Sequence, residues 1–246
     1  MNIIIPMAGL GKRMRPHTLT VPKPLLPIAG KAIVHRLVED IAKICSEKID
    51  KIGFIINPSF GIEVEENLKQ IAKQVGAEGK IFYQEQALGI SHALLFAKEL
   101  FKGKVIVAFA DTLFKADFKL DTSRDGIIWV QKVVDPSQFG VVQLNEKGEI
   151  IELVEKPTSF VSDLAIIGIY FFKDGEALAK EMQYLIDHDI KDKGEYQFTS
   201  ALQGLRKKGA VLTTGQVTEW LDCGNKNVTV QTNQRYLEFI KDQKLI

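Results

Sequence analysis

NIIIPMAGLGKRMRP, residues 2–16, opens the chain with an apolar β-branched run that ends in a loop containing two glycines. Three consecutive isoleucines predict a strand that is buried on both faces of a sheet. Glycines placed directly after such a strand let the backbone approach a phosphate group and present its amides, although they also suit an ordinary tight turn. This opening therefore favours an α/β fold with a ligand site beside the first strand.

The rest of the first half repeats the pattern of buried strand and amphipathic helix. Further strands are expected at 52–56, 80–83, 105–109 and 126–130, and apolar residues at helical spacing lie near 33–41, 64–71 and 93–101. Strands that alternate with helices predict a doubly wound, mostly parallel, Rossmann-like sheet with helices on both faces.

After about residue 130 the pattern becomes mixed. It predicts a hairpin at 140–144 and 150–154, strands at 166–172, 211–214 and 220–221, and helices at 176–188, 198–208 and 225–245. We expect one α/β domain over residues 1–246, with no linker or internal repeat to divide it.

Composition excludes several classes of protein. Lys and Arg number 32 against 31 Asp and Glu, so no general charge favours nucleic acid or an anionic membrane as partner. Cys45 and Cys223 are not in a metal-ligand spacing, which argues against a zinc site or a disulfide scaffold. With no apolar run near the roughly 20 residues that span a bilayer, we expect a cytoplasmic location.

The glycine loop does not match two common nucleotide motifs. A dinucleotide fingerprint requires a third small residue where Met14 stands, which disfavours an NAD enzyme. A Walker loop requires Ser or Thr after Gly-Lys, whereas Arg13 follows Lys12.

The sequence TLTVPKPLLPI (18–28) holds Lys23 between two prolines that fix the backbone. Together with the glycine loop, the stretch 9–28 closely resembles the signature of the nucleotide-sugar pyrophosphorylases. The similarity continues in order along the chain, through QEQALGISHA (84–93), FADT (109–112), FGVV (139–142), VEKP (154–157) and WLDCG (220–224).

This resemblance implies a nucleoside triphosphate and a sugar 1-phosphate as substrates, bound by about 1–130 and about 131–246 respectively. It also implies the following site residues: Arg13 and Lys23 for catalysis; Ala8, Gly9, Gly11, Gln84 and Gly89 for the nucleotide; Gly140, Glu155 and Lys156 for the sugar phosphate; and Asp111 and Asp222 for Mg²⁺.

The positions of the two aspartates support a metal role independently of the resemblance. Asp111 follows the apolar run 105–109, so it should lie near the carboxyl end of a parallel strand, where open α/β sheets bind ligands. Asp222 also follows a short strand pattern, and Mg²⁺ commonly takes only one or two protein carboxylates.

The implied reaction needs positioned charge rather than a base. A sugar phosphate is already an anion and can attack the α-phosphorus directly, so the protein must offset repulsion of about 4 kcal/mol between unit charges about 4 Å apart at an effective dielectric constant of about 20. The amide of Gln84 offers a donor and an acceptor to a base edge, which favours dTTP or UTP. Glucose 1-phosphate is the favoured acceptor.

Other substrates stay open at this point. Lys12, Ala32 and Ser200 differ from the residues that relatives usually carry, so the motifs do not determine which sugar is the substrate. The alternatives are a mannose-1-phosphate guanylyltransferase, a cytidylyltransferase with a non-sugar acceptor, and a silent sugar-nucleotide sensor. Homo-oligomerisation is also open. Many relatives carry a C-terminal left-handed β-helix, whose hexapeptide repeats do not occur in residues 1–246.

Overall fold

The strand that opens the chain lies in the middle of the sheet. In the computed structural model, which describes residues 1–244, β1 (Asn2–Pro6) pairs in parallel with β4 (Lys51–Ile56) and with β6 (Val105–Ala108). β5 (Glu78–Tyr83) continues the parallel pairing beside β4. The expected parallel arrangement of the first half is confirmed.

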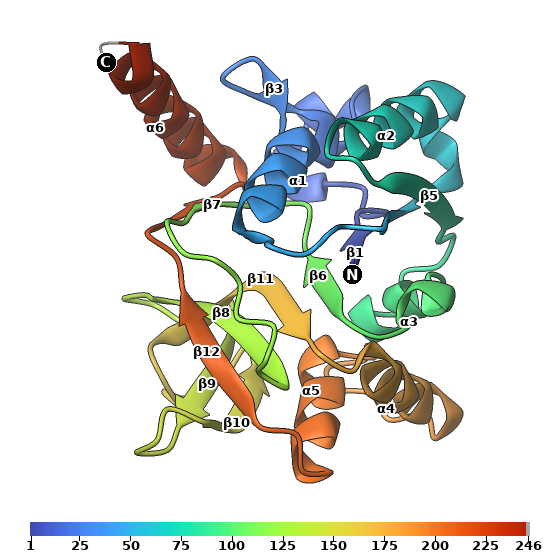
Figure 1. Ribbon diagram of the computed structural model, residues 1–246, viewed down its shortest axis with the longest axis vertical. Helices are drawn as coiled ribbons and strands as arrows, with labels where there is room; N and C mark the ends of the chain where they lie inside the picture. Colours follow the sequence, from blue (N-terminus) through green and yellow to red (C-terminus); the bar gives the residue numbers. More distant parts are fainter. Residues whose placement is uncertain (245–246) are drawn as a thin grey trace.

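Helices cover both faces of this sheet (Figure 1). Ile3 and Ile5 of β1 pack with one group of helices, and Ile4 packs with the other, because successive strand side chains point to opposite faces. The first group is α1 (Ile33–Ile44) and α2 (Ile62–Gln74), and the second is α3 (Ile90–Leu95), α4 (Gly175–Asp187) and α5 (Phe198–Lys207). This is the doubly wound layer that the sequence predicts.

The second half extends the sheet with mixed pairing. β11 (Leu164–Phe172) runs antiparallel to β6 and to β8 (Gly126–Lys132). β9 (Gly140–Leu144) and β10 (Ile150–Glu155) form the expected hairpin, and β12 (Leu212–Gln216) pairs in parallel with β8. The sequence pattern places β8 with the alternating strands and helices of the first half. In the structure its partners, β11 and β12, both belong to the second half.

A small separate sheet lies next to the carboxyl end of β6. β7 (Thr112–Lys115) pairs antiparallel with β13 (Glu219–Asp222), and the register places Asp222 opposite Thr112. The sequence predicts part of β13 but not β7, because β7 is a short segment directly after the Asp111 motif.

Two helix ends differ from the sequence expectation. The helix expected at 93–101 is the shorter α3, followed by a 3₁₀ turn at Lys98–Leu100 whose apolar residues continue the same spacing. The expected C-terminal helix is α6 (Lys226–Lys244), and Leu245 lies outside the described residues.

The loop after β1 folds into short turns rather than into a helix. Its elements are 3₁₀ turns at Lys12–Met14, His17–Leu19 and Lys23–Leu25, followed by a hairpin of β2 (Pro27–Ile28) and β3 (Lys31–Ala32). A further 3₁₀ turn, Pro58–Phe60, precedes α2. Prolines in this region prevent a continuous helix.

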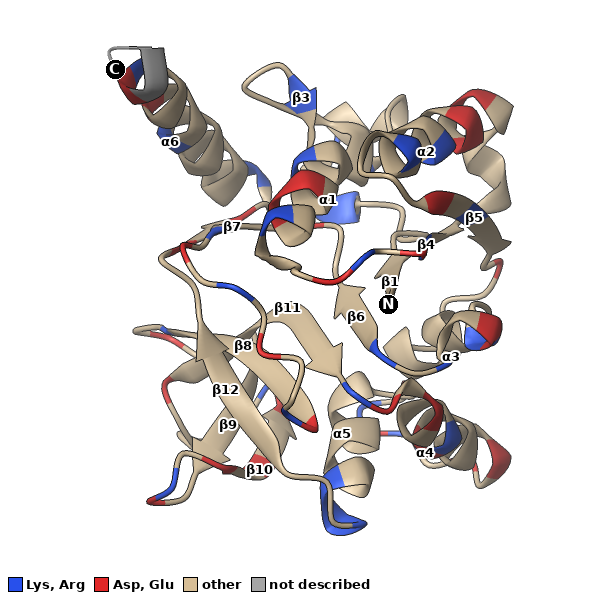
Figure 2. Ribbon diagram, viewed as in Figure 1, with Lys and Arg blue, Asp and Glu red and all other residues tan. Residues whose placement is uncertain are grey.

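Charged residues of both signs are interspersed over the helices and loops, whereas the labelled strands in the centre of the molecule are largely uncharged (Figure 2). Among the helices of residues 1–244, none combines the length and the apolar character that crossing a membrane requires.

Candidate functional site

Two adjoining cavities lie at the carboxyl ends of the parallel strands. The larger, of about 510 Å³, is lined by the loop after β1 and by the 84–90 segment. The smaller, of about 180 Å³, is lined by residues of β9, β10, β11 and β13. Arg13, Phe109, Asp111 and Gly224 line both cavities. A ligand in one cavity would therefore meet a ligand in the other beside these four residues.

The glycine loop contributes to the larger cavity through close backbone packing. Gly11 has φ +59°, and a Cβ on it would lie 3.0 Å from side-chain carbons of Lys23 and Thr18. The Thr18 hydroxyl donates to the Gly11 carbonyl at 2.8 Å. Gly11 thus brings Lys23 against the loop, while Ala8 and Gly9 line the cavity beside it.

Lys23 is buried although it carries a charge, with 8% of the residue exposed. Its Nζ donates to Asp111 Oδ2 at 2.7 Å and to the Gly224 carbonyl at 3.2 Å. Buried ammonium groups need such partners, because an unpaired charge in the interior is strongly unfavourable. Lys23 therefore also holds Asp111 at the junction of the cavities.

Arg13 differs from Lys23 in its environment. It is exposed, it lines both cavities, and it forms no ion pair with any residue of the described range. Its guanidinium group is thus available to a ligand, and its planar fork suits phosphate oxygens.

Asp111 lines both cavities, and Asp222 lines the smaller one. The Cys223 amide donates to the Asp111 carbonyl at 2.9 Å, which joins the two segments through their backbones. Burial raises the pKa of Asp222, the bond from the Gly224 amide lowers it, and the nearby Asp111 carboxylate raises it further. Two partly buried carboxylates that repel each other favour a cation between them.

The donor set of these carboxylates fits a hard divalent cation. Lys23 contacts Asp111 Oδ2 and the Gly224 amide contacts Asp222 Oδ1 at 2.7 Å, so the other oxygen of each carboxylate accepts no hydrogen bond from the described residues. Within residues 1–244, no group of three or more His, Cys, Asp or Glu side chains is arranged to hold a metal ion. Two carboxylates suit a cation that completes its shell with phosphate and water.

Gln84 and Gly89 both line the larger cavity. Gln84 is nearly buried, and its Nε2 donates to the Gln86 carbonyl at 3.0 Å. Gly89 has φ +115°, and a Cβ there would lie 2.6 Å from the backbone N and O of Tyr196. The space that the missing side chain leaves is therefore used by the Tyr196 backbone, and contact of Gly89 with a base stays a prediction.

Substituting Gly89 by alanine is expected to lower the free energy of unfolding by about 3 kcal/mol or more, because backbone strain and overlap with Tyr196 add. Gly76→Ala is the matched control: φ is +79° but no atom lies within 4 Å of its Cβ position. The control should lose only about 1 kcal/mol. Urea unfolding measures both, and equal losses would contradict the close-packing role of Gly89.

The smaller cavity brings Gly140 and Glu155 together as expected. A Cβ on Gly140 would lie 3.1 Å from Glu155 Oε2 and 3.2 Å from Thr199 Cγ2. Thr199 Oγ1 donates to Glu155 Oε2 at 3.3 Å, so this threonine orients the carboxylate. The sequence resemblance did not assign Thr199 a role.

Lys156 is not among the residues that line either cavity. It has φ +41°, its side chain is 54% exposed, and its Nζ lies 3.7 Å from Glu155 Oε1. Lys193 supports this turn, because its Nζ donates to the carbonyls of Glu155, at 2.7 Å, and Lys156. The sequence analysis did not identify Lys193, because its only local signal is a Lys-Gly pair that is typical of an ordinary turn.

Comparisons with known proteins agree with the fold and with the family that the sequence resembles. A family model described as nucleotidyl transferase matches residues 2–238. The bifunctional protein GlmU of Methanocaldococcus jannaschii is 31% identical over 243 residues, which cover 98% of this chain and 55% of the relative. The glucose-1-phosphate thymidylyltransferase of Streptomyces antibioticus is 31% identical over 247 residues, with 97% and 67% covered. The chain thus spans about half the length of the GlmU relatives it matches.

A solved structure supports the same relationship. It is a Bacillus anthracis protein, provisionally named a glucose-1-phosphate thymidylyltransferase and crystallised with sucrose. Its TM-score is 0.79 at 26% identity, and the match covers 95% of this chain and 94% of that one. The chain therefore belongs to the nucleotidyl transferase family, which confirms the resemblance to the nucleotide-sugar pyrophosphorylases.

Proposed function

We propose that this protein transfers a nucleotidyl group from dTTP or UTP to glucose 1-phosphate in the cytoplasm, giving a nucleotide sugar and pyrophosphate. The observation that carries the proposal is the junction of the two cavities at Arg13, Asp111 and Gly224. A triphosphate in the larger cavity and a sugar phosphate in the smaller one would place their phosphate groups at this junction.

The reaction forms one bond and breaks another at the α-phosphorus. An oxygen of the sugar phosphate attacks that phosphorus, and the bond to the bridging oxygen of the β-phosphate breaks as pyrophosphate leaves. The acceptor oxygen is already ionised, so no residue must remove a proton. The task of Arg13 and Lys23 is to offset the repulsion between the two anions and to hold them in line.

Asp111 and Asp222 would hold Mg²⁺ at the same junction. When bound, the ion neutralises phosphate charge and orients the phosphate groups. Lys23 contacts one oxygen of Asp111 and lines the triphosphate cavity, so it links the carboxylate to the nucleotide side of the site. We therefore expect Lys23 to act near the α-phosphate.

The smaller cavity supplies groups for a sugar. Glu155 can accept hydrogen bonds from hydroxyl groups, Thr199 fixes its orientation, and Gly140 leaves the backbone accessible. Lys156 lies at the edge of this site next to Glu155, from where its flexible side chain can reach a sugar phosphate. Lys193 adds a second positive charge at the same turn.

Gln84 favours a base with a ring N–H group. One N–H of its amide is bonded to the Gln86 carbonyl, so the side-chain oxygen can accept a hydrogen bond from a base and the second N–H can donate one. Thymine, uracil and guanine carry such a donor, whereas adenine and cytosine present a ring acceptor at the equivalent position. The side-chain oxygen therefore suits the base of dTTP or UTP, and it would suit that of GTP equally.

A substrate screen tests the proposal. Each of four triphosphates would be incubated with the 1-phosphates of glucose, mannose and N-acetylglucosamine and with non-sugar phosphates, and pyrophosphate would be measured. We expect dTTP or UTP with glucose 1-phosphate to be preferred by some hundredfold, because a wrongly matched base leaves buried polar groups unpaired. Turnover only with GTP and mannose 1-phosphate would reject dTTP or UTP as the nucleotide donor and glucose 1-phosphate as the acceptor. Turnover only with a non-sugar phosphate would reject the sugar site, and ligand binding without turnover would indicate a sensor.

A further inference from the structure

Helix α6 contacts the body of the protein through a row of polar side chains. Thr232, Asn233 and Tyr236 share one face, because residues three and four apart lie on the same side of a helix. Asn233 Oδ1 accepts from the Ala29 amide at 2.7 Å, next to the hairpin of β2 and β3. Figure 1 shows α6 running outward from this region to one corner of the molecule.

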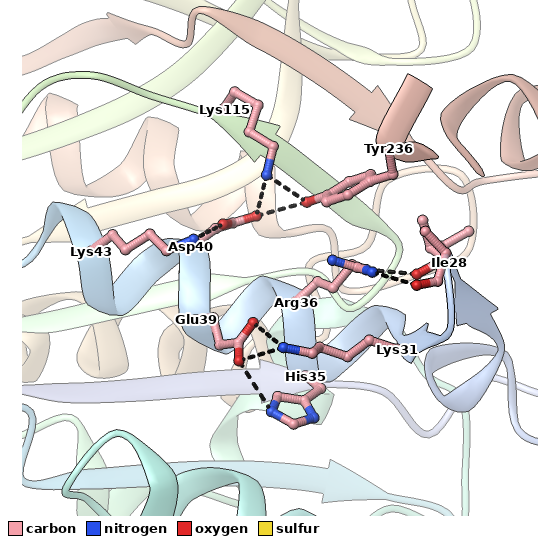
Figure 3. Close-up of polar contacts among 10 residues, drawn as sticks. Ile28, Lys31, His35, Arg36, Glu39, Asp40, Lys43, Lys115 and Tyr236 are labelled. Carbon is pink, nitrogen blue, oxygen red and sulfur yellow. Dashed lines mark hydrogen bonds and ion pairs between the residues drawn. The ribbon is translucent and has the colours of Figure 1, made fainter. Parts of the chain in front are cut away.

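Tyr236 anchors the helix in a buried polar cluster (Figure 3). Its hydroxyl donates to Asp40 Oδ2 at 2.8 Å, and Lys115 Nζ lies 3.2 Å from the hydroxyl and 3.7 Å from the same carboxylate. The guanidinium of Arg36 lies 4.4 Å from the centroid of the Tyr236 ring. Tyr236 and Asp40 are both buried, so these contacts fix the helix strongly.

Thr232 joins this anchored helix to the carboxylate pair. It is 4% exposed, and its hydroxyl donates to the backbone carbonyl of Asp222 at 2.6 Å. The Gly224 amide donates to Asp222 Oδ1 at 2.7 Å, and the Gly224 carbonyl accepts from Lys23 Nζ at 3.2 Å. Lys23 completes the chain at Asp111, at 2.7 Å.

The turn from Asp222 to Gly224 has little room to adopt another geometry. A Cβ on Gly224 would lie 3.0 Å from Asp222 Oδ1, so the carboxylate packs directly over this glycine. The peptide plane between Asp222 and Cys223 is held on one side by Thr232 and on the other by the bond from the Cys223 amide to the Asp111 carbonyl, so losing the Thr232 hydroxyl would release one of its two restraints. A change of 1 Å in such a site is large compared with the tolerance of a metal ligand.

We propose that Thr232 is a positioning residue, which ties the helix anchored at Tyr236 and Asp40 to Asp222 and so keeps the carboxylate pair in metal-binding geometry. The inference rests on the proposed Mg²⁺ role of Asp111 and Asp222. If Thr232 only packed the helix, its loss would change stability and leave metal affinity unaltered.

The test compares Thr232→Val, which keeps the shape of the side chain but loses the hydroxyl, with Thr232→Ser, which keeps the hydroxyl. Calorimetric titration with Mn²⁺ measures binding to the purified full chain, and pyrophosphate release gives the half-saturating Mg²⁺ concentration. For Thr232→Val we expect Mn²⁺ affinity to fall about tenfold and the half-saturating Mg²⁺ concentration to rise about tenfold. For Thr232→Ser both quantities should stay within about threefold of the wild type. At saturating Mg²⁺ the turnover of Thr232→Val should largely recover, as a simple loss of folded protein would not.

Three control variants separate the possible failures. Val230→Ala, at an exposed position of α6, should bind Mn²⁺ like the wild type, and Leu178→Ala, in the core away from the site, measures the effect of lowered stability alone. Wild-type affinity in Thr232→Val, or equal weakening in Leu178→Ala, would overturn the inference. Wild-type affinity in Asp222→Asn would instead overturn the proposed metal site. If Thr232→Val does not fold, Tyr236→Phe replaces it. We expect its Mn²⁺ affinity to be about threefold weaker than that of the wild type, and wild-type affinity would overturn the inference.

Discussion

Replacing Arg13 with alanine is expected to slow nucleotidyl transfer on the order of a thousandfold or more, by analogy with arginine fingers in phosphoryl transfer. Arg13 lines both cavities and forms no ion pair with a residue of the described range, so its charge is available to a ligand. The lost charge would leave the repulsion between triphosphate and sugar phosphate uncompensated. Initial rates of pyrophosphate release at saturating substrates measure the effect.

Arg15→Ala is a matched control for this prediction. Arg15 lies two residues further along the same loop and is exposed, but it is not among the residues that line either cavity. Its removal should change the rate less than about tenfold. Arg13→Lys should recover only part of the activity, since a lysine keeps the charge without the planar fork. A loss below about tenfold in Arg13→Ala would reject the role of Arg13.

Asp222→Asn is expected to reduce turnover at least about a hundredfold without lowering the stability of the metal-free protein. Loss of a supporting group around a metal typically costs about 10–100-fold, and loss of a direct ligand should cost more. Burial and Asp111 raise the pKa of Asp222, which means that the folded state disfavours its charge. A neutral asparagine relieves this penalty and can still accept from the Gly224 amide, so the free energy of unfolding should stay equal or rise.

Asp111→Asn should lose similar activity but should also destabilise the protein, because buried Lys23 would lose its charged partner. Chelation of divalent ions should abolish turnover in the wild type, and added Mg²⁺ should restore it. Full activity after chelation, or in both asparagine variants, would contradict the metal assignment. Thermal unfolding in the presence of chelator gives the stability comparison.

The sequence predicts the fold well because its strongest signals are local. Buried runs of β-branched residues and helical spacing identify the parallel strands and most helices, and the glycine loop after β1 lines the larger cavity as expected. The partners of β8 and the existence of β7 were not predictable in this way. Strand pairing depends on contacts between distant segments, and β7 is too short for a periodic pattern.

In the candidate site, too, residues within sequence motifs were predictable, whereas contacts between distant segments were not. Motifs identify Arg13, Lys23 and the two aspartates, and in the structure Arg13 and Asp111 line both cavities, Lys23 lines the larger and Asp222 lines the smaller. Lys156 is the exception, because it has a positive φ that no motif predicted and it does not line either cavity. The bonds made by Thr199, Lys193 and Thr232 to residues 10–44 positions away were likewise invisible to motif reasoning.

The most direct test of the proposed transfer is to follow both products at once by ³¹P NMR. The protein would be incubated with Mg²⁺, dTTP or UTP, and glucose 1-phosphate, using Arg13→Ala as the negative control. We predict that pyrophosphate and a nucleoside diphosphate sugar appear in equal amounts, and that neither forms when the sugar phosphate is omitted. Pyrophosphate together with a nucleoside monophosphate, or no product with any sugar phosphate, would contradict the account.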